Sequence, residues 1–587
     1  MMPDAFGCFF NITELVDHLT PYLAKNDISK LARTCRKMHT RCTLSLFRTL
    51  LADDGSIPRL FTSTPALLAL SRNSQHVREL NLYLYDLVFY YNCLLTFQDM
   101  NSHLSNTPPT RPPWLPPPDI HAYQLVALPP MTRLSRLSFH SHRTNYPLPP
   151  YKLPSADNSG GTLAQLTLLI SLSPRLTSLS LQEVSIADMA ECRRLEDVIA
   201  KLHAIKKLEL SIESEVNMRF AIFSRLFFSC PSSLQRLRLY FPGRSTDEDE
   251  RGNVIAVPRK QEALINLREL LIRGIHDWNS ATDIRSIFAH CPNINKLSLS
   301  VVMGHQETDE IEQFISKHCP RIESLDFCGY YMDSVEPFPF RIMGSLPPQQ
   351  ITEFVYRGAL PYDSKFKTDV AFQRHSTTLR SIIISGHGIL PQALFPMIVK
   401  ECCNLDELLI GFGRCSDSHI TFDDALQTPW ACTKLTSLAL GISGCELPVE
   451  PGVKPYYHRP TPITLTEVEA QHFSRLEFLY RQIGSLTALR ELDLAMVPPD
   501  EGLDGMLLVH KSSTSFPAML SIRNTSTNRP GFLHHLSGLK QLKALHGSFL
   551  KDRLKFNQLW QIWDATEGAS TSEIMSVFAT LLQHLET

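Results

Sequence analysis

The sequence has no strong excess of charge and no long apolar segment. Its 57 Lys and Arg residues nearly balance its 59 Asp and Glu residues, which leaves a formal net charge of −2. This balance provides no overall field that would recruit nucleic acid or an anionic membrane. No apolar run approaches the roughly 18–20 residues that a membrane-spanning helix needs. We therefore expect neither nucleic acid nor a membrane among the partners.

The sequence also lacks the features of a secreted protein. The segment from Met1 to Phe10 has no basic region ahead of its short apolar patch, so a signal peptide is not expected. The 14 cysteines are scattered along the chain. Without a secretory signal they are expected to be reduced and mostly buried thiols, as in proteins of the cytoplasm or the nucleus.

Compact catalytic and metal-binding motifs are missing. The sequence contains no G-x-S-x-G, no H-E-x-x-H and no G-x-x-x-x-G-K-[ST]. Gly411 and Gly413 are spaced like the start of a phosphate loop, but Ser416 stands where the third glycine belongs. Cysteines never form the C-x-x-C cluster of zinc sites, and the pair His290-Cys291 is more typical of a buried helix end. We therefore expect no enzymatic activity, no cofactor and no metal site.

The dominant feature of the sequence is a phrase of six residues, apolar-x-x-apolar-x-apolar, that returns about every 28 residues. In an extended strand, residues two apart share a face, so the second and third apolar residues of each phrase should face one core. A period of this length indicates stacked units that bury their apolar faces against their neighbours. The nine clearest phrases begin at Ile205, Leu234, Leu267, Ile294, Ile322, Ile351, Leu379, Leu405 and Leu435.

The segments between these phrases have the period of a helix. Asp283 can cap a helix in which Ile284, Ile287 and Phe288 follow at helical spacing. A strand and a helix in every unit would lay each parallel strand beside the one before it. Helices are wider than strands, so the stack should curve, with the strands on the concave side and the helices on the convex side. The predicted fold class is therefore α/β, a curved solenoid with an N-terminal all-α module.

The phrase L-x-x-L-x-L, preceded by a helix end that carries a cysteine, resembles the cysteine-containing class of leucine-rich repeats. With its weaker copies, the array is predicted to hold about 12 to 14 repeats. The matching cysteines are Cys291, Cys319, Cys402 and Cys432, and Cys230 lies one residue further back.

The predicted organisation has four parts. Residues 1–50 form a helical module, 51–75 a connecting segment, 76–550 the solenoid and 551–587 a C-terminal helical cap. Segments without periodicity are predicted to be surface insertions. These insertions are 108–118, 147–161, 244–251 and 445–462.

The first fifty residues begin with a predicted helix. Asn11 and Glu14 have the spacing of a capping box, and Leu15, Leu19 and Leu23 form an apolar stripe after them.

Two further helices are predicted behind the first. Asp27 opens the second helix, in which Ile28, Leu31 and Cys35 recur at helical spacing, and residues 44–50 supply a third. A module of this size lies near the lower limit of about 40 residues for independent folding, so it should need a partner or the solenoid behind it.

This helical module resembles an F-box, whose pattern is Leu-Pro-x-Glu-(Ile/Leu), regularly spaced leucines, Asp-Leu, Val-Cys-Arg-x-Trp and Leu-Trp-Arg-x-Leu. An F-box followed by leucine-rich repeats is the arrangement of F-box/leucine-rich-repeat proteins. The resemblance implies a substrate-recognition subunit of a cullin-type (SCF-like) ubiquitin ligase, in the cytoplasm or the nucleus. The matching segments are Glu14-Leu15, Leu19, Leu23, Asp27-Ile28, Thr34-Cys35-Arg36-x-Met38 and Leu46-Phe47-Arg48-x-Leu50.

The resemblance also implies the partners. The helical module would dock on the Skp-type adaptor, and through it on a cullin, while the solenoid holds a protein target. The family's opening Leu-Pro is absent and Met38 replaces its Trp, so an interaction scaffold whose degenerate F-box is only an N-terminal cap remains the alternative. The expected adaptor-binding residues are Leu15, Leu19, Leu23, Ile28, Leu31 and Cys35.

Residues between the buried strand positions should point to the concave face. Arg236, Arg238, Tyr240, Arg273 and Arg357 fall at such positions. A strip of arginines could grip carboxylates or a phosphorylated segment with paired hydrogen bonds, which predicts a target-binding surface. A solvated face with scattered charge is the alternative.

Overall fold

The described residues of the computed structural model fall into two compact units. The first lies within Met1–Trp278 and Ala289–Ile294, and the second within Asn279–Phe288 and Asn295–Thr587. The structure describes residues 18–51, 64–83, 128–141, 159–214, 219–242, 263–274, 281–300, 305–329, 338–359, 368–387, 389–411, 418–445, 452, 465–497, 523–524, 529–530, 535 and 538–547.

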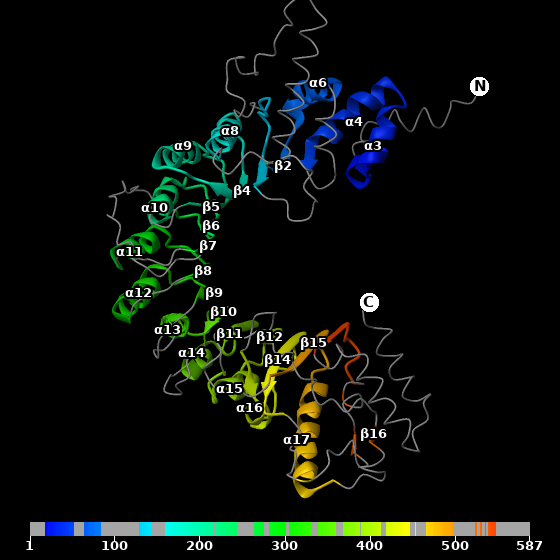
Figure 1. Ribbon diagram of the computed structural model, residues 1–587, viewed down its shortest axis with the longest axis vertical. Coiled ribbons are helices and arrows are strands. Elements are labelled where there is room, and N and C mark those ends of the chain that lie inside the picture. Colours follow the sequence, from blue (N-terminus) through cyan, green and yellow to red (C-terminus); the bar gives the residue numbers. More distant parts are fainter. Residues whose placement is uncertain are drawn as a thin grey trace, which may run out of the picture. The chain divides into compact units, whose positions relative to one another are not determined.

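The first unit is a parallel sheet with helices on one side. Its strands pair in chain order, each with the next, and every pair is parallel. Helices α8, α9 and α10 lie along one side of these strands (Figure 1). Its elements are η1 (Thr20–Tyr22), α3 (Lys25–Ala32), α4 (Arg36–Arg48), β1 (Thr49–Leu51), α6 (Thr64–Asn73), η2 (Ser74–His76), β2 (Glu79–Tyr83), β3 (Arg136–His140), α8 (Ser159–Ser171), β4 (Ser178–Ser185), α9 (Met189–Ala200), β5 (Lys207–Glu213), α10 (Arg219–Ser229), β6 (Arg236–Tyr240) and β7 (Glu269–Arg273).

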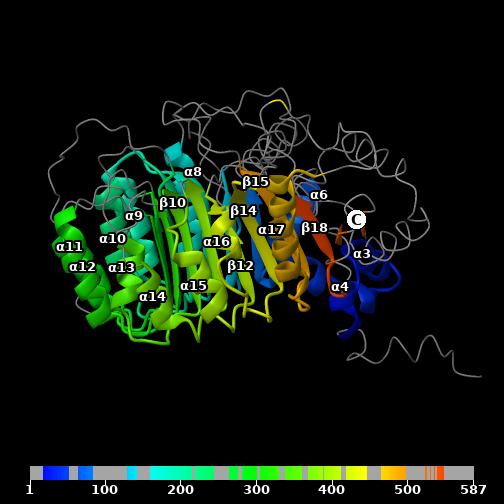
Figure 2. The same cartoon turned by 90° about the horizontal axis from the view of Figure 1, so that it is seen from below.

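The second unit repeats the same arrangement. Its main strands are again parallel neighbours, and the helices between them lie on one side (Figure 2). A short antiparallel pair, β16 (Arg523–Asn524) with β17 (Arg529–Pro530), stands apart from this sheet. The other elements are α11 (Ala281–His290, whose last two residues fall in the first unit), β8 (Lys296–Ser300), α12 (His305–His318), β9 (Ser324–Gly329), α13 (Phe338–Ser345), β10 (Glu353–Ala359), α14 (Thr368–His375), β11 (Ser381–His387), α15 (Leu394–Glu401), β12 (Glu407–Ile410), β13 (Ile420–Thr421), α16 (Phe422–Leu426), β14 (Ser437–Ser443), α17 (Glu467–Gly484), β15 (Glu491–Val497) and β18 (Ala544–Gly547).

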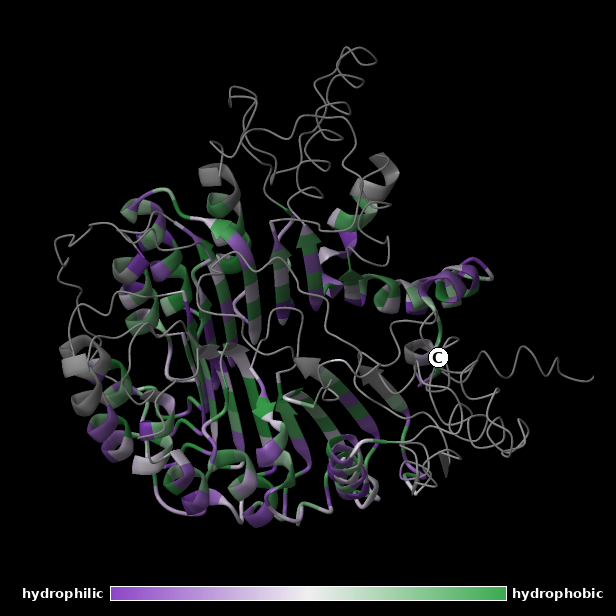
Figure 3. Cartoon of the chain, turned by 60° about the horizontal axis from the view of Figure 1, so that its bottom comes forward, coloured by the Kyte–Doolittle hydropathy of each residue, from purple (hydrophilic) through white to green (hydrophobic). Residues whose placement is uncertain are grey.

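The predicted strand register is confirmed. Leu208 pairs with Leu237, and Leu237 with Leu270, so equivalent residues of successive phrases lie side by side. Leu325 and Phe354 pair in the same way in the second unit, and both are fully buried. Figure 3 shows the result as alternating hydrophobic and hydrophilic residues along the strands. The apolar residues of the phrases therefore form the core between strands and helices, as their spacing predicts.

The turns before the strands are held by shared backbone acceptors. The carbonyl oxygen of Thr177 accepts hydrogen bonds from the N–H groups of Lys206 (2.8 Å) and Lys207 (3.1 Å). The carbonyl oxygen of Lys206 accepts from Gln235 (2.9 Å) and Arg236 (3.0 Å) in the next repeat. Each turn thus begins the pairing of the strand that follows it, which keeps the phrases in register.

Buried cysteines directly follow four of the helices, α10, α11, α12 and α15. Cys291, Cys319, Cys402 and Cys432 are each 0% exposed, and Cys230 is 1% exposed. Burial raises the pKa of Cys319 and of Cys402 to about 12. The prediction of buried thiols at helix ends is confirmed for Cys230, Cys291, Cys319 and Cys402, whereas Cys432 is buried in the turn between α16 and β14.

One buried histidine connects neighbouring repeats of the second unit. The Nδ1 atom of His375 accepts hydrogen bonds from the backbone N–H groups of Gln350 (3.2 Å) and Ile351 (3.3 Å). Its Nε2 lies 2.9 Å from the carbonyl oxygen of Met343 and therefore carries the proton. The ring is 0% exposed, and this burial lowers the pKa of His375. The neutral ring satisfies three backbone groups at once.

The N-terminal helices lead directly into the sheet. Residue Leu50, which the sequence assigned to the third helix, instead lies in β1, is 3% exposed and pairs with Leu80. Helix α4 ends at Arg48 because the chain turns extended at Thr49. Helix α6 occupies part of the predicted connecting segment 51–75.

Several predicted segments lie outside the described residues. These are the start of the first helix, with Asn11, Glu14 and Leu15, the insertions 108–118 and 244–251, nearly all of the insertions 147–161 and 445–462, and the C-terminal cap 551–587.

Candidate functional sites

Large exposed apolar side chains gather in the N-terminal helices. Tyr22 is 87% exposed, Leu44 48%, Leu19 42% and Leu23 37%. These four, which we call the N-terminal apolar residues, are a third of the twelve large apolar side chains exposed in the described part of the chain. Exposed apolar side chains that concentrate in one short segment are typical of a surface that binds another protein.

The other expected adaptor-binding residues have different environments. Ile28 is 4% exposed and packs with Ala32 and Cys42, so it belongs to the small core between α3 and α4 and not to their surface. Leu31 packs partly buried against this cluster. Cys35 is exposed and caps α4, where its sulfur accepts a hydrogen bond from the backbone of Met38 at 3.5 Å. The helical period brings Ile28 inward because a pair of short helices must bury one apolar stripe between them.

Leu15, which was also expected in the adaptor site, lies outside the described residues. The described surface of the module therefore offers Leu19 and Leu23 from the F-box-like pattern, together with Tyr22 and Leu44.

The sheet face opposite the helices carries the predicted arginines of the first unit. Arg236 and Arg238 are two residues apart on β6, and both reach Glu269 on β7. The Arg236 Nε lies 2.5 Å from Oε2 of Glu269, and the Arg238 Nε donates to Oε1 at 2.8 Å. Burial opposes the charge of Arg238, but its hydrogen bond to Glu269 and their attraction raise the pKa of the guanidinium. Glu269, which is 9% exposed, thus holds the two arginines in one fixed group.

A groove of about 410 Å³ lies beside this group. Burial and the nearby carboxylate of Glu209 raise the pKa of Tyr240, whose side chain lines the groove. Gly274 ends β7 with a φ of +80°, and a Cβ there would overlap the carbonyl oxygen of Phe241, so the bend requires glycine. The groove is lined by Gln182, Glu209, Ser211, Tyr240, Phe241, Pro242, Arg273 and Gly274.

Arg357 belongs to the second unit, where it has its own partners. Its guanidinium lies 2.6 Å from Oδ1 of Asp326, and the Ser298 hydroxyl donates to Oδ2 of the same carboxylate at 3.0 Å. Lys296 bonds Glu353 at 2.8 Å in a second pair on this face.

The structure thus brings together four of the five predicted target-binding residues on β6 and β7 of the first unit, Arg236, Arg238, Tyr240 and Arg273, and places the fifth, Arg357, in the second unit.

The acidic partners of these arginines are what the sequence does not reveal. Their positions on the face follow from strand alternation, but which acid reaches which arginine depends on strand spacing and side-chain length.

Within the residues that the structure describes, no group of three His, Cys, Asp or Glu side chains is placed to hold a metal ion. No helix in the same residues combines the length and the apolar character that crossing a bilayer requires.

Comparison with known proteins adds no assignment. No family model matches the chain. No curated protein is detectably similar to it in sequence.

Proposed function

We propose that this protein is the substrate-recognition subunit of a cullin-type ubiquitin ligase and has no catalytic activity of its own. The N-terminal helices bind a Skp-type adaptor as an F-box does, and the leucine-rich-repeat-like sheet binds the target. The observation that carries this proposal is the exposure of Leu19, Tyr22 and Leu23 on the segment whose residues resemble an F-box.

The energetics of these side chains support the proposal. Burying an exposed leucine or aromatic side chain against a partner contributes roughly 1.5–3 kcal/mol, so Leu19, Tyr22 and Leu23 together could dominate an interface. The core of Ile28, Ala32 and Cys42 is small for a free-standing module, and a partner would add the burial that it lacks.

The charges on the sheet face of the first unit support an acidic target. Lys207, Arg236, Arg238 and Arg273 stand on β5 to β7 with Glu209, Glu213 and Glu269, so four formal positive charges face three negative ones and one positive charge is left in excess. A guanidinium can bond a second acceptor while it keeps its first. A carboxylate or phosphate of the target would thus join the Arg236–Glu269–Arg238 group without breaking it.

One observation favours the alternative of a scaffold with an N-terminal cap. Strand β1 follows α4 at once and pairs with β2, and α4 packs against α6. The helical module therefore packs on the first helix after β1 and leads into the first strand, as a cap would, and a terminal repeat needs a cap with or without an adaptor.

The adaptor experiment separates these functions. A Leu19→Asp/Leu23→Asp variant of the full chain should lose co-purification with the Skp-type adaptor and the cullin, because it places two charges in an apolar contact. Val370→Asp is the matched control, since Val370 is 51% exposed on α14 of the second unit. Adaptor capture that is equal in both variants, or absent in the unmodified chain, would favour the cap.

The target experiment removes the ion pairs on the sheet face of the first unit without introducing like charges that would repel one another. An Arg236→Gln/Arg238→Gln/Glu269→Gln variant keeps hydrogen-bonding groups in place but removes the ion pairs. We expect it to lose a defined set of captured proteins while it still binds the adaptor. An unchanged set of captured proteins would mean that this group is only a solvated part of the face.

A further inference from the structure

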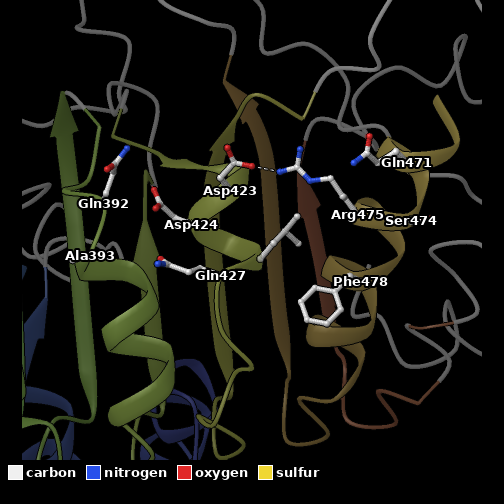
Figure 4. Close-up of a pocket in the computed structure, with 10 residues that line it drawn as sticks. Gln392, Ala393, Asp423, Asp424, Gln427, Gln471, Ser474, Arg475 and Phe478 are labelled. Carbon is white, nitrogen blue, oxygen red and sulfur yellow. Dashed lines mark hydrogen bonds and ion pairs between the residues drawn. The ribbon is translucent and has the colours of Figure 1, made fainter. Parts of the chain in front are cut away.

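A pocket of about 780 Å³ lies on the helix side of the second unit, far along the chain from the N-terminal helices (Figure 4). The pocket lies between α17 on one side and α16, with the residues just before α15, on the other. Both sides of the pocket carry polar side chains, and Phe478 of α17 adds an apolar surface, which gives a bound segment two kinds of contact. None of its residues belongs to the sites described above.

The walls of this pocket are firmly placed. Helix α17 begins with a capping box, in which the Thr466 N–H donates to Glu469 (2.9 Å) and the Glu469 N–H donates to the Thr466 hydroxyl (3.3 Å). Its inner face is buried through Phe473, Leu476 and Leu479. The capping box thus fixes the start of α17, and the buried apolar stripe holds the helix against the repeats.

Two neighbouring carboxylates make the α16 wall acidic. Asp423 is exposed and forms an ion pair with Arg475 of α17. The Arg475 guanidinium lies 4.9 Å from the centre of the Phe422 ring, so a cation–π contact also holds it. Asp424 is 7% exposed and accepts a hydrogen bond from the Thr421 hydroxyl at 2.6 Å. Among the lining residues, two carboxylates face one guanidinium, which leaves a negative charge for a ligand to match.

The remaining lining residues complement a peptide. Phe478 on α17 is 37% exposed and offers an apolar surface. Gln392, Gln427 and Gln471 are exposed around the pocket, and each amide both donates and accepts a hydrogen bond, as a peptide group does. Figure 4 shows Gln392, Gln427 and the two carboxylates on one side of the pocket and Phe478 with Gln471 on the other.

We propose that this pocket binds an extended segment of a partner protein that carries a lysine or arginine beside an apolar residue. The cation lies against Asp423 and Asp424, the apolar side chain lies on Phe478, and the glutamines bond the main chain of the segment. Burial raises the pKa of Asp424, and a cation beside this carboxylate would offset that penalty. The inference is independent of adaptor binding.

The test uses the purified full chain and fluorescent heptapeptides of alanine and leucine with blocked ends. The centre is lysine in one peptide and norleucine, its uncharged counterpart, in the other. We expect fluorescence anisotropy to show about tenfold tighter binding of the lysine peptide, and Asp423→Asn to remove most of this difference. Phe478→Ser should weaken both peptides about fivefold or more.

Val468→Ser provides the matched control, because Val468 is 46% exposed on the same helix but does not line the pocket. Its affinities should stay within about twofold of the unmodified chain, and all variants should keep their thermal midpoints. Equal affinity for the two peptides, or no binding of either, overturns the proposal. A dimer of the unmodified chain that Phe478→Ser dissociates also overturns it, since the occupant would then be a second copy.

Discussion

Strand β12 carries two adjacent leucines that should respond very differently to truncation. Leu408 is 0% exposed and pairs with Ile382 on one side and Leu438 on the other. Leu409 points to the opposite face and is only half-buried. Leu408→Ala and Leu409→Ala therefore make the same chemical change on the same strand and differ only in the face affected.

The expected magnitudes follow from burial. Leucine to alanine removes three carbons, and at about 0.8 kcal/mol per buried carbon the lost transfer energy is about 2.4 kcal/mol for Leu408. The cavity left in a rigid core adds to this loss, which gives about 2–5 kcal/mol in all. Leu409 loses a smaller area and leaves no closed cavity, so about 1 kcal/mol or less is expected.

Urea unfolding and amide hydrogen exchange together measure these losses. Repeat proteins open locally, so exchange of the β11, β12 and β14 amides reports the effect where it arises. A loss of 2 kcal/mol should speed their exchange by about thirtyfold in Leu408→Ala, since 1.4 kcal/mol is a factor of ten. Equal losses in the two variants would refute the assigned strand faces, and a larger loss in Leu409→Ala would reverse them.

Three further predictions rest on single residues. His375 has a folded-state pKa below its ordinary value of about 6.5, so its stabilising effect is complete above that pH and is lost as the pH falls through the folded-state pKa. His375→Asn should therefore flatten the dependence of the thermal midpoint on pH between about 5 and 7. Gly274→Ala should destabilise the first unit by more than about 1 kcal/mol in urea unfolding, because of its positive φ and the overlap with Phe241. Iodoacetamide at mildly alkaline pH should alkylate the exposed Cys403 and spare Cys402, whose pKa burial raises to about 12, as mass spectrometry of the folded chain would show.

The strands and their core could be predicted from the sequence because a local rule determines them. In a parallel strand with helices on one side, every second residue faces the core, so the spacing of Leu208 and Leu210, or of Leu438 and Leu440, already identifies the buried face. Neighbouring phrases have equal lengths, and equal lengths align them in register.

The N-terminal module was predicted less well because tertiary packing, and not a local repeat, decides which of its residues are buried. Ile28 and Leu19 both fit the helical stripe, but only packing decides which of them is covered, and it covers Ile28. Leu50 continues the helical spacing of α4, yet pairing with β2 makes it a strand residue. Tertiary contacts outweigh weak local preferences in such short elements.

Contacts between residues distant in sequence could not be predicted from spacing. The sequence placed Arg236 and Arg238 on one face, but their pairing with Glu269 depends on the distance between adjacent strands and the reach of each side chain. At the pocket between α16 and α17, Asp423 forms an ion pair with Arg475, and no periodic pattern in the sequence links these two positions.

We propose that the N-terminal helices join this chain to a ubiquitin-ligase adaptor, and a direct titration is the sharpest test of that interaction. Purified full chain is titrated with purified Skp-type adaptor in a calorimeter, alongside the Leu19→Asp/Leu23→Asp variant. We expect a saturable one-to-one complex with a dissociation constant of about 1 μM or below, which the variant loses while its thermal midpoint stays unchanged. Absence of binding at about 100 μM, or identical binding by the variant, would contradict it.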